Sequence, residues 1–89
     1  MIELTVECRA EDVLQECLGR GMVVKLEGTV KKHPGGRHWH LGFLRRAGVL
    51  EMTELGGQVS LKVADNRDGG WATELAQELA RSKNAAQHS

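Results

Sequence analysis

The chain has few aromatic residues, few cysteines, one proline and no surplus of charge of either sign. Its 89 residues include two tryptophans, one phenylalanine and no tyrosine, which leaves little for the stacking surface of a single-strand nucleic-acid reader. Two cysteines are too few for a disulfide framework. Twelve basic residues balance twelve acidic ones, so no overall positive field favours nucleic acids. Any such binding must come from a local patch.

The rest of the composition indicates one small soluble domain. The chain is 40% apolar, enough for a core, and its 27% of charged residues exclude both a membrane span and a disordered chain. The N-terminal sequence carries acids early instead of a basic start and an apolar run, so a secretory signal is not expected. We expect a cytoplasmic protein with a single α+β domain over residues 1–81 and a frayed C-terminal tail over residues 82–89. Cys8 and Cys17 lie on apolar stripes, which favours buried, reduced thiols over a redox pair.

Two kinds of apolar spacing alternate along the chain. A spacing of two predicts strands over residues 2–8, 24–31, 38–43, 49–55 and 58–64, and helical spacing predicts helices over residues 10–18 and from Trp71 onward. The order β-α-β-β-β-β-α predicts a mostly antiparallel five-stranded sheet with two helices on one face and an open polar face. We expect that open face to carry Glu3, Thr5, Glu7, Lys25, Glu27, Thr29, Lys31, His38, His40, Glu51, Thr53, Ser60 and Lys62.

Turn residues set the register of two hairpins. If residues 33–36 (HPGG) form a four-residue loop, Val30 lies opposite Trp39 on the face that meets the helices. The same register places His38 and His40 on the open face. Gly56-Gly57 predicts a two-residue turn that pairs Leu55 with Gln58. The pairs that follow are Met52 with Leu61 and Leu50 with Val63 inside, Glu51 with Lys62 and Thr53 with Ser60 outside, and, as an exception on the core side, Glu54 with Val59.

The segment from Lys31 to Leu44, KKHPGGRHWHLGFL, holds three of the four histidines and is the main candidate site. His38 and His40 are two residues apart on one strand face, about 6–7 Å from each other, and could share a ligand. A metal site needs a third or fourth ligand. His33 is the one additional candidate, and the predicted register places no cysteine or carboxylate beside the pair. We therefore expect no metal and no cofactor.

Basic side chains on this hairpin favour a binding function. We expect a small binding or accessory domain that contacts a nucleic-acid backbone or a partner protein, with a homodimer left open and no membrane contact. The predicted binding residues are Lys31, Lys32, Arg37, His38, His40, Arg45 and Arg67.

Whether the protein is an enzyme stays open at this point. No Ser-His-Asp or Cys-His arrangement can be assembled, because both cysteines are expected to face the core. The alternative function is RNA cleavage by general acid-base chemistry, with His38 or His40 moving protons.

A second candidate segment is DNRDGGW, residues 65–71. There we expect Asp65 or Asp68 to cap the last helix. An anion site built from Gly69, Gly70 and Arg67 is the alternative.

Two resemblances accompany these patterns. Residues 36–41, Gly-Arg-His-Trp-His-Leu, resemble the Gly-Ser-His-x-x-Phe segment of HicA-type toxins, which are small RNA-cleaving proteins with a fold of helix, three strands and helix. This resemblance implies that His38 is catalytic, although Arg37 replaces the serine, Leu41 replaces the phenylalanine, and two more strands are predicted here. HPGGRHWHL, GVLEMT and NRDGGW, within residues 33–71, are similar in spacing to small uncharacterised bacterial proteins with GxRHWHL and NRxGxW patterns. That resemblance implies a bacterial cytoplasmic domain and no particular chemistry.

Overall fold

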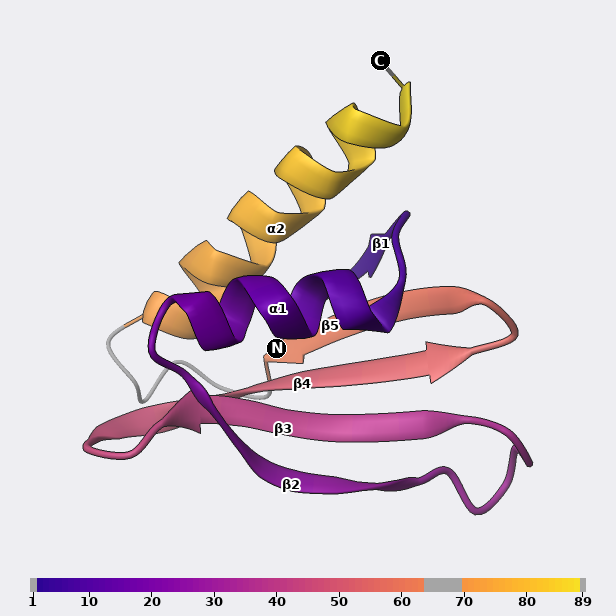
Figure 1. Cartoon of the computed structure of the whole chain (residues 1–89), viewed down its shortest axis with the longest axis horizontal. Coiled ribbons are helices and arrows are strands. Elements are labelled where there is room, and N and C mark those ends of the chain that lie inside the picture. Colours follow the sequence, from indigo (N-terminus) through magenta and orange to yellow (C-terminus); the bar gives the residue numbers. More distant parts are fainter. Residues whose placement is uncertain (1, 64–69, 89) are drawn as a thin grey trace.

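Five antiparallel strands form one open sheet, and both helices pack on the same face of it (Figure 1). The computed structural model describes residues 2–63 and 70–88, with side chains described as far as residue 84. The strand order is β1-β5-β4-β3-β2, so β1 and β2 are the edges. This architecture confirms the predicted α+β fold. The elements are β1 (Ile2–Val6), α1 (Ala10–Gly19), β2 (Val23–Thr29), β3 (Arg37–Phe43), β4 (Arg46–Leu55), β5 (Gln58–Val63) and α2 (Trp71–His88).

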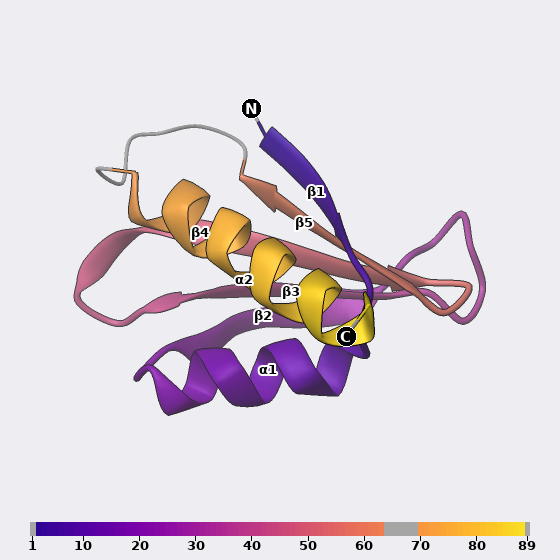
Figure 2. The same cartoon turned by 90° about the horizontal axis from the view of Figure 1, so that it is seen from above.

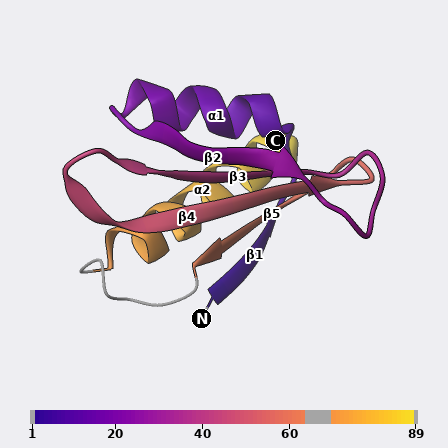
Figure 3. The same ribbon diagram turned by 90° about the horizontal axis from the view of Figure 1, so that it is seen from below.

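The core lies between the sheet and the two helices. The arrangement of these elements is seen from above and from below in Figure 2 and Figure 3. Trp39 is 1% exposed and points toward the helices, as predicted from the alternation around it. Trp71 begins the buried stripe of α2, also as predicted. In the part of the chain that the structure describes, neither helix is long and apolar enough to cross a membrane. The largest fully buried side chains are Trp39, Leu41, Leu50, Met52, Leu61 and Leu79.

Helix α1 begins and ends where its sequence predicts. Glu11 and Asp12 place negative charge in the first turn, where it opposes the partial positive charge of the helix N-terminus. The helix ends before Gly21, whose φ of 87° is readily adopted by glycine, and the N–H of Met22 donates to a carbonyl of the last turn. Leu18, expected in the buried stripe, is 52% exposed. The buried face of α1 is therefore narrower than predicted.

The hairpin of β4 and β5 has the predicted register. Leu55 pairs with Gln58, and Gly56 and Gly57 both have positive φ, as a two-residue turn of this kind requires. Glu54 does face Val59 on the helix side, and the structure shows its role: Glu54 Oε2 accepts a hydrogen bond of 3.2 Å from the N–H of Ala10. A carboxylate on the core side of the sheet thus caps the first residue of α1.

The register of β2 with β3 differs from the prediction. The last paired residues are Thr29 and Arg37, so the connecting loop covers residues 30–36, and within it the N–H of Val30 donates to the carbonyl of Gly36. Trp39 therefore pairs with Glu27, and His38 pairs with Gly28. The shift is three residues, an odd number, and so it exchanges the two faces of β2.

This exchange changes which β2 side chains lie on the open face. Leu26 now pairs with His40 there and is 49% exposed, although the alternation had placed it in the core. Glu27 and Thr29, predicted for the open face, pair with residues that point toward the helices. Lys25 stays on the open face because a bulge between Val24 and Leu26 adds a residue to the strand.

Helix α2 continues past residue 81, where the sequence predicts the beginning of a frayed tail. Its backbone is helical to His88. Asn84 attaches this last part of the helix to the N-terminal region: its Oδ1 accepts a hydrogen bond of 2.7 Å from the N–H of Glu7, and its Nδ2 donates to the carbonyl of Thr5 at 3.4 Å. The predictions for Asp65, Arg67 and Asp68 lie outside the described residues.

Candidate metal centre

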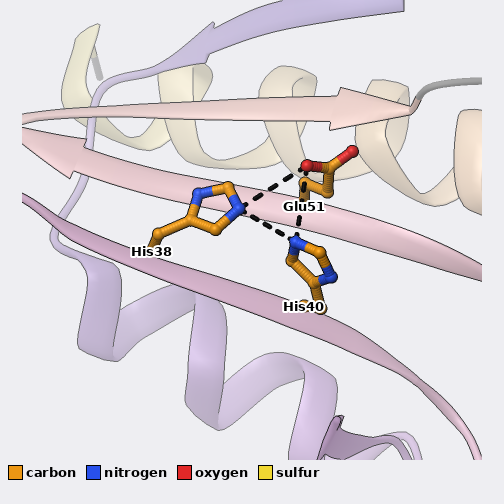
Figure 4. A group of neighbouring side chains, drawn as sticks. All are labelled: His38, His40 and Glu51. Atoms are coloured by element: carbon orange, nitrogen blue, oxygen red, sulfur yellow. Dashed lines mark hydrogen bonds and ion pairs between the residues drawn. The ribbon is translucent and has the colours of Figure 1, made fainter. Parts of the chain in front are cut away.

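Three metal-ligating side chains converge on the open face of the sheet. His38 and His40 come from β3, and Glu51 comes from β4, where it pairs directly with His40. Figure 4 shows the three side chains on the near side of the strands, pointing toward one another, with the helices behind the sheet. Because His38 and His40 are two residues apart, both rings leave the strand on this face.

The three ligand atoms form a compact triangle. His38 Nε2 and His40 Nε2 are 3.0 Å apart, and Glu51 Oε1 is 3.5 Å from each of them. A tetrahedral zinc ion with bonds of about 2.0–2.2 Å holds its ligand atoms about 3.3–3.6 Å apart. Both distances to Glu51 lie in this range, and the remaining edge must lengthen by only about 0.3 Å to reach it. The triangle therefore has the size that a zinc ion needs.

Thr53 holds the ring of His38. Its Oγ1 lies 2.7 Å from His38 Nδ1, and the two residues are paired across β3 and β4. A metal bound at Nε2 requires the ring proton on Nδ1, where the hydroxyl oxygen of Thr53 can accept it. Partners of this kind fix the tautomer and orientation of a ligating histidine. Thr53 is thus a supporting residue rather than a ligand.

The cluster is half-buried and open on one side. The side chains of His38, His40 and Glu51 are 28%, 32% and 22% exposed. Gly28 lies opposite His38 and has no side chain, and a Cβ built on it would meet nothing within 4 Å. With the sheet on one side and open space on the other, a fourth ligand would approach from solvent.

The two thiols do not compete for this role. Cys17 is fully buried, and burial raises the pKa of its thiol to about 11. Burial, together with the charge of nearby Asp12, also raises the pKa of Cys8. Among the described residues, the metal-ligating cluster consists of His38, His40 and Glu51, and neither cysteine belongs to it.

The predicted basic residues that the structure describes lie at different places around β3. Arg37 points to the helix side, where its guanidinium Cζ lies 4.6 Å from the centre of the Trp39 ring and its Nη2 lies 3.2 Å from Glu27 Oε1. Lys31 and Lys32 are exposed in the loop before β3. Arg45 lies in the turn at the other end of β3, and Arg67 is outside the described residues. The polyanion contact expected from the sequence stays a prediction.

Glu51 is the residue that the sequence reasoning missed. Its place on the open face opposite Lys62 was predicted, but its neighbour in β3 was not, because the predicted strands over residues 38–43 and 49–55 left the register between them open. The structure has a two-residue turn at 44–45, after which Phe43 pairs with Arg46. The register then shifts, and regular pairing resumes with Leu41 opposite Leu50. Matching the apolar residues Leu41 with Leu50 would have placed Glu51 beside His40.

Comparisons of the whole chain with protein-family models, curated proteins and solved structures found no significant match in any of the three. Neither resemblance noted in the sequence is therefore tested by them. The geometry of the open face is what remains to indicate a function.

Proposed function

We propose that this protein is a small zinc-binding domain whose single ion is held by His38 Nε2, His40 Nε2 and Glu51 Oε1. The observation that carries this proposal is the triangle of ligand atoms, with edges of 3.0, 3.5 and 3.5 Å. Two imidazoles and one carboxylate form a borderline donor set that suits zinc better than magnesium or calcium, which prefer oxygen ligands.

The number of protein ligands indicates the kind of site. Structural zinc sites are closed by four protein ligands, whereas sites with three leave a position for water or another ligand. Among the described residues, no further histidine, cysteine or acid joins this cluster. We infer that the ion keeps one exchangeable position, directed away from the sheet. Such an ion can polarise or activate what binds there.

The Nε2 atoms of His38 and His40 already lie close together in the metal-free protein. At 3.0 Å the two Nε2 atoms share one proton, because one nitrogen must donate to the other. A divalent cation can bind the lone pairs of both Nε2 atoms once the shared proton has moved to the Nδ1 atom of its own ring.

The direct test is calorimetric titration of zinc into protein that carries no histidine tag and has been stripped of metal with a chelator. We expect one ion per chain. His40→Ala and Glu51→Gln each remove a ligand and should weaken zinc binding by more than about 100-fold. Thr53→Val keeps the shape but removes the acceptor for His38 Nδ1, and a loss of about 10- to 100-fold is expected.

His33→Ala is the matched control, because it removes a histidine in the exposed loop before β3 and leaves the cluster intact. Its zinc affinity should equal that of the wild type. Circular dichroism of each metal-free variant checks that the fold is kept. Zinc affinity unchanged by both His40→Ala and Glu51→Gln would refute the proposed centre.

A further inference from the structure

Two lysines flank the candidate metal centre on the open face. Lys62 of β5 pairs with Glu51, and the Cβ atoms of such pairs are about 4.5–5.5 Å apart. Lys25 lies on the opposite side, where its Nζ is 3.2 Å from the position of a Cβ built on Gly42. Gly42 follows His40 by two residues on the same strand face, a distance of about 7 Å. Both ammonium groups therefore lie within side-chain reach of the ion's open position.

The position of Lys25 depends on the irregularity in β2. Regular alternation after Leu26 would turn Lys25 toward the helix side, and the bulge between Val24 and Leu26 turns it back to the open face. Gly42 then provides the space over which the side chain folds, because a Cβ there would come within 2.9 Å of Lys25 Cε. Two local departures from a regular hairpin thus bring this cation toward the cluster.

Among the residues that the structure describes, no ion pair involves Lys25 or Lys62. Glu3 pairs with Lys62 across β1 and β5 and is the one further acid in that row of the open face. A divalent ion with two neutral imidazoles and one carboxylate has one net positive charge, and the lysines add to it. The surroundings of the fourth position are therefore cationic.

We propose that the fourth position of the zinc ion takes a phosphate oxyanion, for which Lys25 and Lys62 supply counter-charges. This inference rests on the proposed zinc centre. The lysines lie on opposite sides of the cluster, so a ligand that uses both needs several oxygens directed apart. A tetrahedral phosphate can place one oxygen on the metal and others toward each ammonium group, which a chloride ion cannot do. Lysine is also a common phosphate partner.

The same phosphate chemistry has two sources. One is inorganic phosphate or a small phosphate monoester, and the other is the phosphodiester of a nucleic-acid backbone. The space beside Gly28 is open, since a Cβ there would meet nothing within 4 Å. Backbone binding would also bring a nucleic acid onto the hairpin whose exposed loop carries Lys31 and Lys32.

Cobalt substitution separates this inference from the zinc centre itself. Protein loaded with one equivalent of Co²⁺ and freed of excess metal is titrated with inorganic phosphate and, separately, with a short single-stranded RNA at constant ionic strength. The visible absorption of cobalt reports a change of ligand. We expect phosphate to shift the spectrum in a saturable way, and chloride at equal ionic strength to leave it unchanged.

Lys25→Gln and Lys62→Gln should each weaken the apparent phosphate affinity by about threefold or more, the effect of one unit charge at about 6 Å in a watery environment. Their cobalt affinity should not fall, because neither residue is a ligand. Lys32→Gln, in the exposed loop, is the matched control and should leave phosphate binding unchanged. A shift with phosphate alone supports a small ligand, and a shift with RNA supports the backbone phosphodiester.

Three results would overturn the inference. Failure of cobalt and zinc to bind refutes the metal centre and the inference together. Tight cobalt binding without any spectral response to phosphate or RNA refutes the oxyanion alone. A response that is equal in the wild type, Lys25→Gln and Lys62→Gln would show that the lysines take no part.

Discussion

The two faces of the sheet are built from alternate residues of the same strands, yet they differ in almost every property. On the helix side, Trp39 and Met52 pair across β3 and β4 and are almost completely buried. On the open side, their chain neighbours His40 and Glu51 pair across the same strands and remain half-exposed. Burial on the helix side supplies the stability of the fold. The residues of the open side can therefore stay polar and in contact with water.

The largest difference between the two faces is expected when Trp39 is replaced with alanine. Removing a fully buried tryptophan should lower the free energy of unfolding by about 3–5 kcal/mol, a large part of what a domain of this size has. His40→Ala, one residue along the strand, should lower it by about 1 kcal/mol or less in the absence of metal. Denaturant unfolding of both metal-free variants measures the difference. Equal losses would contradict the division between the faces.

A smaller effect is expected at Glu54, a carboxylate on the helix side. Its hydrogen bond to the N–H of Ala10 caps α1, and Glu54→Ala should lower the free energy of unfolding by about 1 kcal/mol. Glu51→Ala is the matched change on the open face of the same strand. Without metal it should have a smaller effect, because Glu51 caps no helix. If the Glu51 variant were the less stable of the two in urea, this interpretation of β4 would be wrong.

The smallest effect concerns the ion pair that joins α1 to α2. Arg20 Nη2 lies 2.9 Å from Glu78 Oε1, and this hydrogen bond, more than the charge of Arg20, lowers the pKa of Glu78. A carboxylate whose pKa is lowered by folding stabilises the protein above its ordinary pKa, and that contribution disappears as the pH falls through the folded-state pKa.

The difference in melting temperature between the wild type and Glu78→Gln should therefore be present near neutral pH and vanish in strong acid. Because the pair is exposed, added salt should reduce it. A difference that grew as the pH fell would have the wrong sign.

The sequence predicted most of the helix side and the hairpin of β4 and β5. The Gly56-Gly57 turn and the alternation of apolar residues in both strands favoured one register, which pairs Met52 with Leu61, because a slip by one residue would have exposed most of the apolar side chains. Trp39 was placed correctly for the same reason. On the helix side, a wrong pairing of strands would expose apolar side chains to water. The pattern of apolar residues is therefore enough to predict the strand register there.

The candidate site could not be predicted in full, because it depends on loop lengths and bulges that carry little burial energy. The loop of residues 30–36 contains Pro34 and two glycines, and this composition is compatible with several loop lengths. The irregular pairing after Leu41 then decides which residue of β4 lies beside His40. The lysine that folds over Gly42 depends on a similar bulge. Such local departures are set by tertiary packing and leave no periodic signal.

The alternation in β3 also has a mechanical consequence. Between the two imidazoles of the proposed centre, the chain is anchored by an indole that is almost completely enclosed. Packing of this ring on the helix side restricts the backbone of β3, and it therefore helps to set the spacing of the His38 and His40 imidazoles on the open side. Trp39 is not a ligand of the proposed centre, yet substitutions in the core around it should weaken metal binding there, because they change how β3 is held beneath the two histidines.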